Sequence, residues 1–360
     1  MHRRNIHYWK CDRPAAFHGT TPSSSIESIQ EALQAQLASH FQCPTLTLSP
    51  ARGQGIHLTW TCNLKGISLF IRVAHGPEAD SQLAVESALL DRLNKLGIPV
   101  PKVFACDDSR KHLPFGWQAM ELIPHPDLNH WQKQGCLHPH KIPYEIGLNI
   151  ARWQSFKPPG FGILELTQAG NLIGGHSSYQ TYFQLNLSRH LDFLHAREFI
   201  DCALRERIVC AIEAGSPLMH LQHGVLVHKD LALWNILGSP ERVSAFIDFE
   251  DAISGDPTED LALLACFHQG TFLKAALTGY ETINPLPKDF LRRFWLHLLR
   301  NMLVKSVIRV GAGYFDRTDS FFLINQGTSG SDLKSFTQSR ISSALDGFEN
   351  NLEITNTSLP

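Results

Sequence analysis

The chain has 360 residues, which is enough for one sizeable core or for two lobes with a cleft between them. Hydrophobic residues make up 43% and charged residues 18%, and the 20 prolines and 25 glycines follow no period, which excludes a disordered, collagenous or coiled-coil protein. Lys and Arg number 32 against 34 Asp and Glu, so the net charge is −2. A chain with no large positive field is not expected to bind nucleic acid or an anionic membrane surface.

Targeting signals and metal-binding patterns are also missing from the sequence. No stretch has the roughly 18 uncharged apolar residues of a membrane-spanning helix, and residues 1–14 lack the apolar core of a secretory signal. We therefore expect a cytoplasmic protein that does not cross a membrane. The eight cysteines form no Cys-x-x-Cys pair, which argues against a zinc ribbon or a disulfide scaffold and favours reduced thiols.

The first third of the chain predicts a helix and then an antiparallel sheet. The capping-box pattern Ser24-x-x-Glu27 and apolar residues at helical spacing predict a helix over 25–41. Short runs with a period near two follow, and they predict an antiparallel meander. Its strands are expected at 45–48, 57–61 and 68–73, followed by a helix over 83–96 and two further strands, 102–105 and 116–123.

After Pro124 the pattern becomes mainly helical, with apolar faces at 143–156, 179–198, 203–222, 258–279 and 287–310. The simplest partition is an α+β fold in which a small sheet-rich N-lobe joins a larger helical C-lobe near 121–126. The expected divisions are an N-terminal extension and helix over 1–44, an N-lobe over 45–123, a C-lobe over 124–350 and a tail over 351–360.

Three polar clusters in the C-terminal half carry the candidate chemistry. Apolar triplets lead into and out of the clusters, so Asp230, Asn235 and Asp248 are predicted in loops at strand ends, where they can converge. Asn235 follows Asp230 by five residues, and Asp248 lies 13 residues beyond Asn235. One carboxylate that orients a hydroxyl, with an amide oxygen and a second carboxylate that hold Mg²⁺, is the set that phosphoryl transfer requires. The protein-kinase motif H-R-D-x-x-x-x-N followed by Asp-Phe has the same arrangement.

These clusters resemble the aminoglycoside phosphotransferase and choline kinase-like family, relatives of protein kinases that phosphorylate hydroxyl groups of small molecules. The family patterns are His-Gly-Asp-x-x-x-x-Asn, Ile-Asp-Trp/Phe-Glu-Asp-Ala and Gly-Asp-Pro-x-x-Asp-Leu-Ala. Here His228, Asp230 and Asn235 match the first pattern, 247–252 the second and 255–262 the third, and the resemblance spans about 45–300. It implies a two-lobed protein kinase-like fold that uses ATP and Mg²⁺ to phosphorylate a small-molecule hydroxyl substrate.

The resemblance also implies roles for these residues. Asp230 would orient the acceptor hydroxyl and accept its proton, whereas Asn235 and Asp248 would hold Mg²⁺. Arg72 ends a strand where the family carries a basic residue that contacts the nucleotide phosphates. On the following helix Glu86 falls on the inward, apolar face, where a carboxylate requires a cation, and Arg72 is the natural partner.

Two further nucleotide contacts are predicted in the N-lobe. Gly53 and Gly55 lie between short strands, where glycine would let backbone N–H groups approach phosphates, although a plain hairpin turn explains them about as well. Residues Glu121 and Ile123 occupy the place of the family's linker, which binds adenine through main-chain groups. Side-chain identity carries no information there, so this assignment is by position alone.

Other polar residues of the clusters have structural interpretations. By resemblance Asp256 and Asp260 cap a helix and brace the catalytic loop, and His228 is a hydrogen-bonded scaffold. Lys229 departs from the family, because it replaces a glycine. Its long cation could either assist transfer or point outward. The family's Leu-His is Trp153-Gln154 here, a departure that bears on substrate preference.

Charge distribution gives a first indication of the substrate. Residues 285–345 contain nine Lys or Arg and four Asp, which favours a neutral or anionic hydroxyl compound over a polycationic aminoglycoside. Two alternatives to a small-molecule kinase stay open: a catalytically silent nucleotide-binding or interaction protein of the same fold, and a protein kinase. A protein kinase is disfavoured, because Gly255 follows Asp248 so soon that an activation segment has no room.

Overall fold

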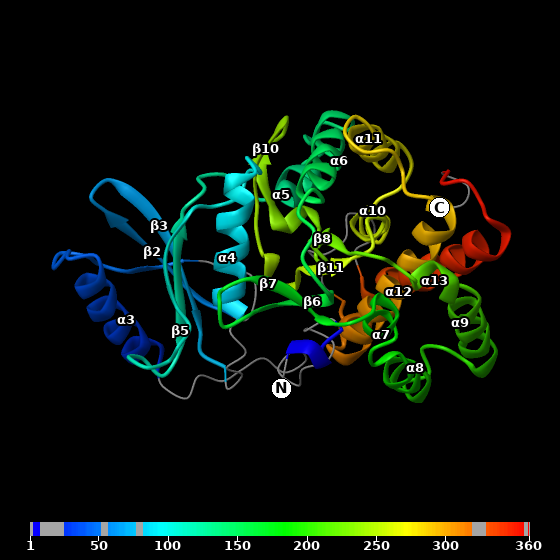
Figure 1. Ribbon diagram of the computed structural model, residues 1–360, viewed down its shortest axis with the longest axis horizontal. Helices are drawn as coiled ribbons and strands as arrows, with labels where there is room; N and C mark the ends of the chain where they lie inside the picture. Colours follow the sequence, from blue (N-terminus) through cyan, green and yellow to red (C-terminus); the bar gives the residue numbers. More distant parts are fainter. Residues whose placement is uncertain are drawn as a thin grey trace.

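The computed structural model describes residues 3–7, 25–51, 57–76, 82–318, 329–355 and 359. A sheet-containing N-terminal part lies beside a larger C-terminal part that is mainly helical, as Figure 1 shows. The predicted two-lobed α+β fold is therefore confirmed. No helix within these described ranges has the length and apolarity needed to cross a membrane.

The N-terminal part is built on one antiparallel sheet of five strands in the order β1-β2-β3-β5-β4. The strands are β1 (Ser49–Pro50), β2 (Leu58–Leu64), β3 (Ile67–Ala74), β4 (Val103–Asp107) and β5 (Gly116–Glu121). Strand β3 is central, and Arg72 pairs in register with Gln118 of β5. Arg72 and Gln118 therefore lie side by side on one face of the sheet, near its middle.

Helices α3 (Ile26–His40) and α4 (Gln82–Lys95) cover opposite faces of this sheet (Figure 1). Alternate residues of β3 point to opposite faces: Leu69, Ile71 and Val73 share a core with the apolar side of α3, while Arg72 faces α4 and its Glu86. The apolar side of α4 joins the core of the C-terminal part. Helix α4 thus packs on the C-terminal core while its Glu86 pairs with Arg72 of the N-terminal sheet.

The C-terminal part combines helices with short strands. Its helices are α5 (Leu128–Lys133), α6 (Lys141–Trp153), α7 (Tyr179–Phe183), α8 (Leu187–Ala196), α9 (Cys202–Ala214), α10 (Glu259–Leu264), α11 (Gly270–Glu281), α12 (Phe290–Gly311) and α13 (Gly330–Asn350). A four-stranded sheet has the order β7-β6-β11-β8, and β9 pairs with β10. These strands are β6 (Phe161–Leu166), β7 (Leu172–His176), β8 (Val225–Val227), β9 (Ile236–Ser239), β10 (Arg242–Phe246) and β11 (Ile253–Gly255).

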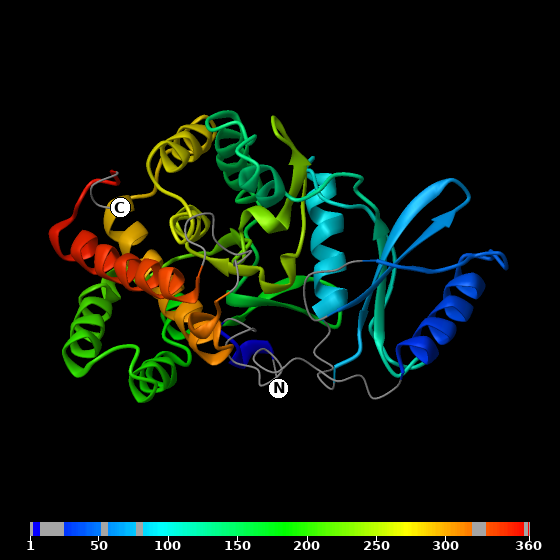
Figure 2. The ribbon, with the colours of Figure 1, turned by 180° about the vertical axis from the view of Figure 1, so that it is seen from behind.

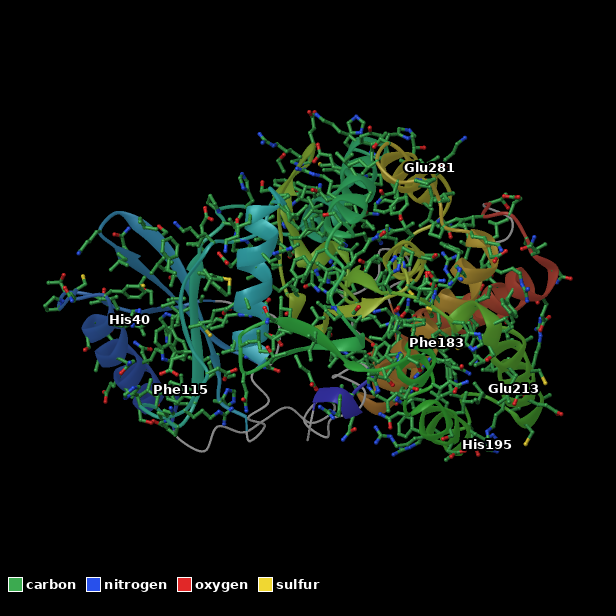
Figure 3. All side chains as sticks on the ribbon, in the orientation of Figure 1. His40, Phe115, Phe183, His195, Glu213 and Glu281 are labelled. Atoms are coloured by element: carbon green, nitrogen blue, oxygen red, sulfur yellow. The ribbon has the colours of Figure 1, made fainter. Side chains whose placement is uncertain are left out.

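Buried aromatic side chains fill both parts. In Figure 3 Phe115 lies at the N-terminal sheet and Phe183 among the C-terminal helices, and both are almost fully buried. Residues 3–7 also lie against the C-terminal part: Ile6 belongs to its core, and the Tyr182 hydroxyl donates to the His7 carbonyl at 2.6 Å.

Several predicted boundaries were wrong. The helix predicted from 25 begins at Ile26 and is capped by Ser25, whose hydroxyl accepts from the N–H of Ser28, rather than by Ser24. The strand predicted at 45–48 is displaced to Ser49–Pro50. The regions 179–198 and 258–279 each hold two helices, because turns around Asn186 and His268 interrupt them. The strands β6 and β7 and the helix α13 were not predicted.

Candidate active site

A buried ion pair between the sheet and α4 forms the N-terminal side of the site. Arg72 is 8% exposed and Glu86 1% exposed, and the guanidinium of Arg72 contacts the Glu86 carboxylate. The side-chain amide oxygen of Gln118 accepts from Arg72 Nη2 at 2.9 Å. The other carboxylate oxygen of Glu86 accepts from the backbone N–H of Phe249 at 3.0 Å, so this pair is tied to the loop after β10. The predicted pairing of Arg72 with Glu86 is confirmed.

The loop after β10 brings two more carboxylates to Arg72. Glu250 Oε1 lies 3.1 Å from Arg72 Nη1, and Asp248 Oδ1 lies 3.6 Å from it. Asp248 has a left-handed backbone (φ 67°), a conformation that an L residue adopts at some cost. Its side chain is 34% exposed against 4% for Glu250, so Asp248 can reach a ligand while Glu250 is enclosed.

The loop after β8 carries the second acidic group. Asp230 is 3% exposed, and the Asn235 amide donates both to its carboxylate at 3.0 Å and to its backbone carbonyl at 2.8 Å. The backbone carbonyl of Asn235 in turn accepts from the backbone N–H of Ile247 at 3.0 Å, and Ile247 immediately precedes Asp248. The two loops are therefore joined next to their functional side chains, and Asp230, Asn235 and Asp248 converge as predicted.

Asp260, at the start of α10, holds the Asp230 loop from behind. Its carboxylate accepts from the backbone N–H groups of His228 at 2.9 Å and Lys229 at 3.1 Å, and from the indole of Trp153 at 3.2 Å. Burial raises the pKa of Asp260 to about 7, against the opposing effect of the two backbone donors. His228 Nε2 lies 3.0 Å from the Ile247 carbonyl. Asp260 and His228 therefore have the bracing roles predicted for them.

Asp256 anchors the same region to α12. Burial alone would raise the pKa of its carboxyl, but His297, Arg293 and the N–H of Thr258 together hold this pKa below its usual range. His297 Nε2 lies 3.3 Å from the carboxylate, and the Thr258 N–H donates to it at 2.8 Å. Asp256 thus braces the loop before α10, as expected, but neither it nor Asp260 caps α10, whose N-cap residue is Thr258.

Lys229 follows neither of the two routes considered from the sequence. Its side chain is 4% exposed and is directed into the C-terminal part, where the ammonium contacts the Glu259 carboxylate and donates to Asn301 Oδ1 at 3.1 Å. Glu259 also accepts from the Tyr179 hydroxyl at 2.5 Å. The backbone of Lys229 is left-handed (φ 72°), which is the reason a glycine fits this position. Lys229 is a buried structural cation.

The pair that departs from the family pattern lies behind the loop. Trp153 is fully buried and donates to Asp260, as described above. The Gln154 amide donates to the Pro257 carbonyl at 2.8 Å and accepts from the Tyr280 hydroxyl at 2.8 Å. Both side chains therefore hold residues of the third motif, Trp153 at Asp260 and Gln154 at Pro257.

The remaining predicted nucleotide contacts have different outcomes. Gly53 and Gly55 lie outside the described residues. Glu121 ends β5 with an exposed side chain, and its N–H donates to the Lys102 carbonyl at 2.8 Å. Ile123 follows in the linker, where its N–H donates to none of the residues that the structure describes. Adenine binding there stays a prediction.

Sequence reasoning missed two contacts. His57 Nε2 lies 2.5 Å from Glu250 Oε1, so the Glu250 carboxylate is shared between His57 and Arg72. Lys305 of α12 places its ammonium 3.8 Å from Asp230 Oδ1. Only the general rule that a buried carboxylate requires a partner could have pointed to Lys305, because the two residues are 75 positions apart and leave no local pattern.

Asn235 and Asp248 have the chemistry of a magnesium site. Because the Asn235 amide nitrogen is turned to Asp230, its oxygen faces away and accepts no hydrogen bond from the described residues. Mg²⁺ binds one or two protein oxygens together with substrate phosphates and waters. The described chain accordingly offers no group of three or more His, Cys, Asp or Glu side chains that could hold a metal alone. These two residues fit Mg²⁺ that arrives with a nucleotide.

Comparisons with known proteins agree with this geometry. The model of the phosphotransferase enzyme family matches residues 47–293, more than half of the chain. None of the curated proteins compared with the chain matches it.

Solved structures show the same fold at low sequence identity. A thermostable mutant of the aminoglycoside phosphotransferase APH(4)-Ia has a TM-score of 0.62 at 14% identity, over 87% of this chain and 98% of that one. A putative fructosamine-3-kinase from Thermobifida fusca has 0.57 at 19%, over 78% and 96%. The macrolide 2'-phosphotransferase MphH from Brachybacterium faecium has 0.53 at 19%, over 79% and 93%.

One ternary complex of the APH(4)-Ia mutant contains ADP and hygromycin B. The solved structures show that the chain has the two-lobed, protein kinase-like fold. On the match to the family model, the chain belongs to the phosphotransferase enzyme family.

Proposed function

We propose that this phosphotransferase moves the γ-phosphoryl group of ATP to a hydroxyl group of a small molecule. The observation that carries the proposal is the convergence of Asp230 and Asn235 with Asp248, opposite the Arg72–Glu86 pair. Phosphoryl transfer depends chiefly on positioning and electrostatic stabilisation, and this arrangement supplies a carboxylate, an amide oxygen and a cation around one point.

Asp230 acts on the hydroxyl group of the acceptor substrate. Its carboxylate accepts the proton as the substrate oxygen bonds to the γ-phosphorus, and the bond from that phosphorus to the bridging oxygen of ADP breaks. The Asn235 amide fixes the carboxylate from one side, and the Lys305 ammonium, 3.8 Å away, lies on another. Because Asp230 is 3% exposed, its orientation is set by these partners rather than by solvent.

The nucleotide lies between the two lobes in this proposal. Arg72, oriented by Glu86 and Gln118, contacts its phosphates, and the main chain at Glu121 and Ile123 contacts adenine. Gly53 and Gly55 are proposed to approach the phosphates through backbone N–H groups. Asn235 and Asp248 would hold Mg²⁺, which when bound neutralises phosphate charge.

The roles of the two central carboxylates can be tested separately. Asp230→Asn keeps the shape of the side chain, so Mg-ATP affinity should stay nearly constant while turnover falls about 10²–10⁴-fold. Asp248→Ala removes a metal ligand, so metal-dependent ATP binding and turnover should both collapse. ATP titrations at fixed Mg²⁺ and single-turnover rates measure the two quantities.

Asp192→Asn provides a matched control, because this exposed carboxylate pairs only with Arg205 among the described contacts and lies away from the site. Both measured quantities should be unchanged in it. Equal loss of nucleotide affinity in the Asp230 and Asp248 variants would show that the roles are misassigned. Nucleotide binding without turnover of any hydroxyl compound would instead support the silent nucleotide-binding alternative.

A further inference from the structure

A row of polar residues runs along α12, behind the proposed active site. Residues 293, 297, 301, 305 and 309 recur every four positions and so form one continuous ridge that winds slowly around the helix, with each member next to the one before it. Asp256 is the partner of the first two, and Asn301 accepts from Lys229. Lys305 lies 3.8 Å from Asp230. The first four positions of the row thus all serve the loops that carry the proposed active site.

The last member of the row, Arg309, has no carboxylate partner among the residues that the structure describes. It is 3% exposed, and its guanidinium donates to the Thr337 hydroxyl of α13 at 2.7 Å. No described Asp or Glu forms an ion pair with it. A buried cation that meets only a neutral hydroxyl is costly, because the interior does not replace its lost hydration.

Arg340 lies on α13, one turn beyond Thr337, and the two helices pack side by side (Figures 1 and 2). Arg340 is 1% exposed and donates to the Gln269 side chain at 2.8 Å, but within the described ranges its Nε and Nη1 atoms have no hydrogen-bond partner. It too forms no ion pair with a described carboxylate. Arg340 therefore leaves two buried donors without an acceptor in the described part of the chain, one turn from the hydroxyl that holds Arg309.

The charges of both arginines act on the buried thiol of Cys266. Burial raises the pKa of the Cys266 thiol, and Lys305, Arg309, Arg340 and Lys229 oppose that rise. Burial lowers the pKa of both Arg309 and Arg340 to about 10, so both stay charged at neutral pH. Lys229 is neutralised by Glu259. The charges of Arg309 and Arg340 have no such compensation within the described chain.

We propose that Arg309 and Arg340 bind an anionic group of the acceptor substrate, so that the substrate is a small hydroxyl compound bearing a carboxylate or a phosphate. Two guanidinium forks match the oxygens of either group. Arg309 is one helical turn from Lys305, about 6 Å along α12, and Lys305 adjoins Asp230. A short carbon skeleton can therefore place its hydroxyl at Asp230 and its anion at the two arginines.

This inference rests on the proposed function, because it names the substrate class of that reaction. It also shows which of the basic residues counted over 285–345 are already bound within the protein. That count included Arg293 and Arg300, but Arg293 is bound by Asp256, and Arg300 donates to the carbonyls of Phe183 and Leu185 at 2.9 and 2.8 Å. The preference for an anion is thus assigned to Arg309 and Arg340 rather than to the net charge of the segment.

A binding test uses inorganic phosphate as the probe. Melting temperatures are measured with saturating Mg-AMP-PNP, so that the nucleotide site is filled, in sodium phosphate and in sodium chloride of equal ionic strength. Phosphate should raise the melting temperature of the wild type but not of Arg309→Met or Arg340→Met. Arg207→Met is the control, since this exposed arginine of α9 pairs with Asp346 and Glu349, and it should keep the phosphate response.

The same melts separate binding from a structural role. In chloride alone the two methionine variants should be at least as stable as the wild type, because each removes an uncompensated buried charge while keeping apolar volume. Arg340→Lys keeps the positive charge but loses the planar guanidinium, so phosphate should raise its melting temperature only weakly. This variant replaces Arg340→Met if the methionine variant does not fold. An equal phosphate response in all variants overturns the proposal, as does a large loss of stability in chloride.

An activity test compares acceptors in matched pairs, D-glycerate with glycerol and glucose 6-phosphate with glucose. At least one anionic member should exceed its neutral partner in kcat/KM by about 10- to 100-fold, the range expected for charged hydrogen bonds. The preference should disappear in Arg309→Met and Arg340→Met, mainly through KM, and persist in Arg207→Met. If the wild type turned over the neutral compounds or kanamycin at least as efficiently as the anionic compounds, the substrate class would be overturned but phosphotransfer would stay intact. Failure to bind any nucleotide would instead reject the proposed function.

Discussion

Lys229 illustrates how one residue can leave a motif's chemistry intact while changing what supports it. The position requires a left-handed backbone, which glycine adopts without cost and lysine does not. The buried ion pair with Glu259 and the hydrogen bond to Asn301 offset this cost. The loop is therefore anchored by a side chain below it, where the family pattern has none.

Breaking this ion pair should destabilise the protein. Lys229→Gly suits the backbone but leaves the Glu259 carboxylate buried without a cation, so the free energy of unfolding should fall by about 3–5 kcal/mol. Adding Glu259→Gln removes the uncompensated charge and should restore part of the loss, because the amide can still bond to Tyr179. Urea denaturation of the two single variants and the double variant measures the effect. Strictly additive losses would contradict a coupled pair.

At the scale of elements, α4 determines how the nucleotide side of the site is connected to the loop of Asp248. Glu86 uses one carboxylate oxygen for Arg72 of β3 and the other for the N–H of Phe249. The apolar side of the same helix belongs to the core of the C-terminal part. A single helix thus couples the position of Arg72 to that of Asp248.

Neutralising Glu86 should weaken that coupling. Glu86→Gln keeps the shape and an acceptor for Phe249 but loses the charge opposite Arg72, so Mg-ATP affinity should fall about 10-fold or more. Asp91→Asn on the same helix is the matched control, because Asp91 is exposed and pairs only with Lys95 at i+4 among the described contacts. Calorimetric titration with Mg-ATP measures both variants. Unchanged affinity in Glu86→Gln would remove Arg72 and Glu86 from the nucleotide site.

The features that the sequence predicts well are those set by local spacing. The phase of one strand and one helix was enough to pair Arg72 with Glu86, and the intervals between Asp230, Asn235 and Asp248 were enough to predict their convergence. Long-range partners were not predictable in this way. Glu259 neutralises Lys229 from 30 residues away, and neither residue carries a local sign of the other.

Missed elements have similar physical causes. The strands β6 and β7 are short and their pairing shifts register, so their alternation is weak in the sequence. Helix α13 did carry a signal, because Ser329 and Asp332 form a capping box at its start. That signal was overlooked, and with it the position of Arg340.

For the whole molecule, the two parts do not divide cleanly along the chain. Residues 3–7 precede the N-terminal sheet in sequence but pack on the C-terminal part, beside β6 and β7. The carbonyl of Asn5 accepts from the Asn186 amide at 3.1 Å, and the His7 ring stacks on Tyr182 with centroids 4.7 Å apart. The core of the larger part therefore includes residues from both sides of the N-lobe sequence.

Ile6 provides the test of this arrangement, because it is fully buried in the C-terminal core. Ile6→Ala should lower the free energy of unfolding by about 2–5 kcal/mol, through lost burial and the cavity left behind. Ile26→Ala is the matched control, since Ile26 begins α3 and is 50% exposed, and it should change stability by no more than about 0.5 kcal/mol. Urea denaturation followed by tryptophan fluorescence measures both variants. If Ile6→Ala were as stable as Ile26→Ala, residues 3–7 would contribute no packing to the folded protein in solution.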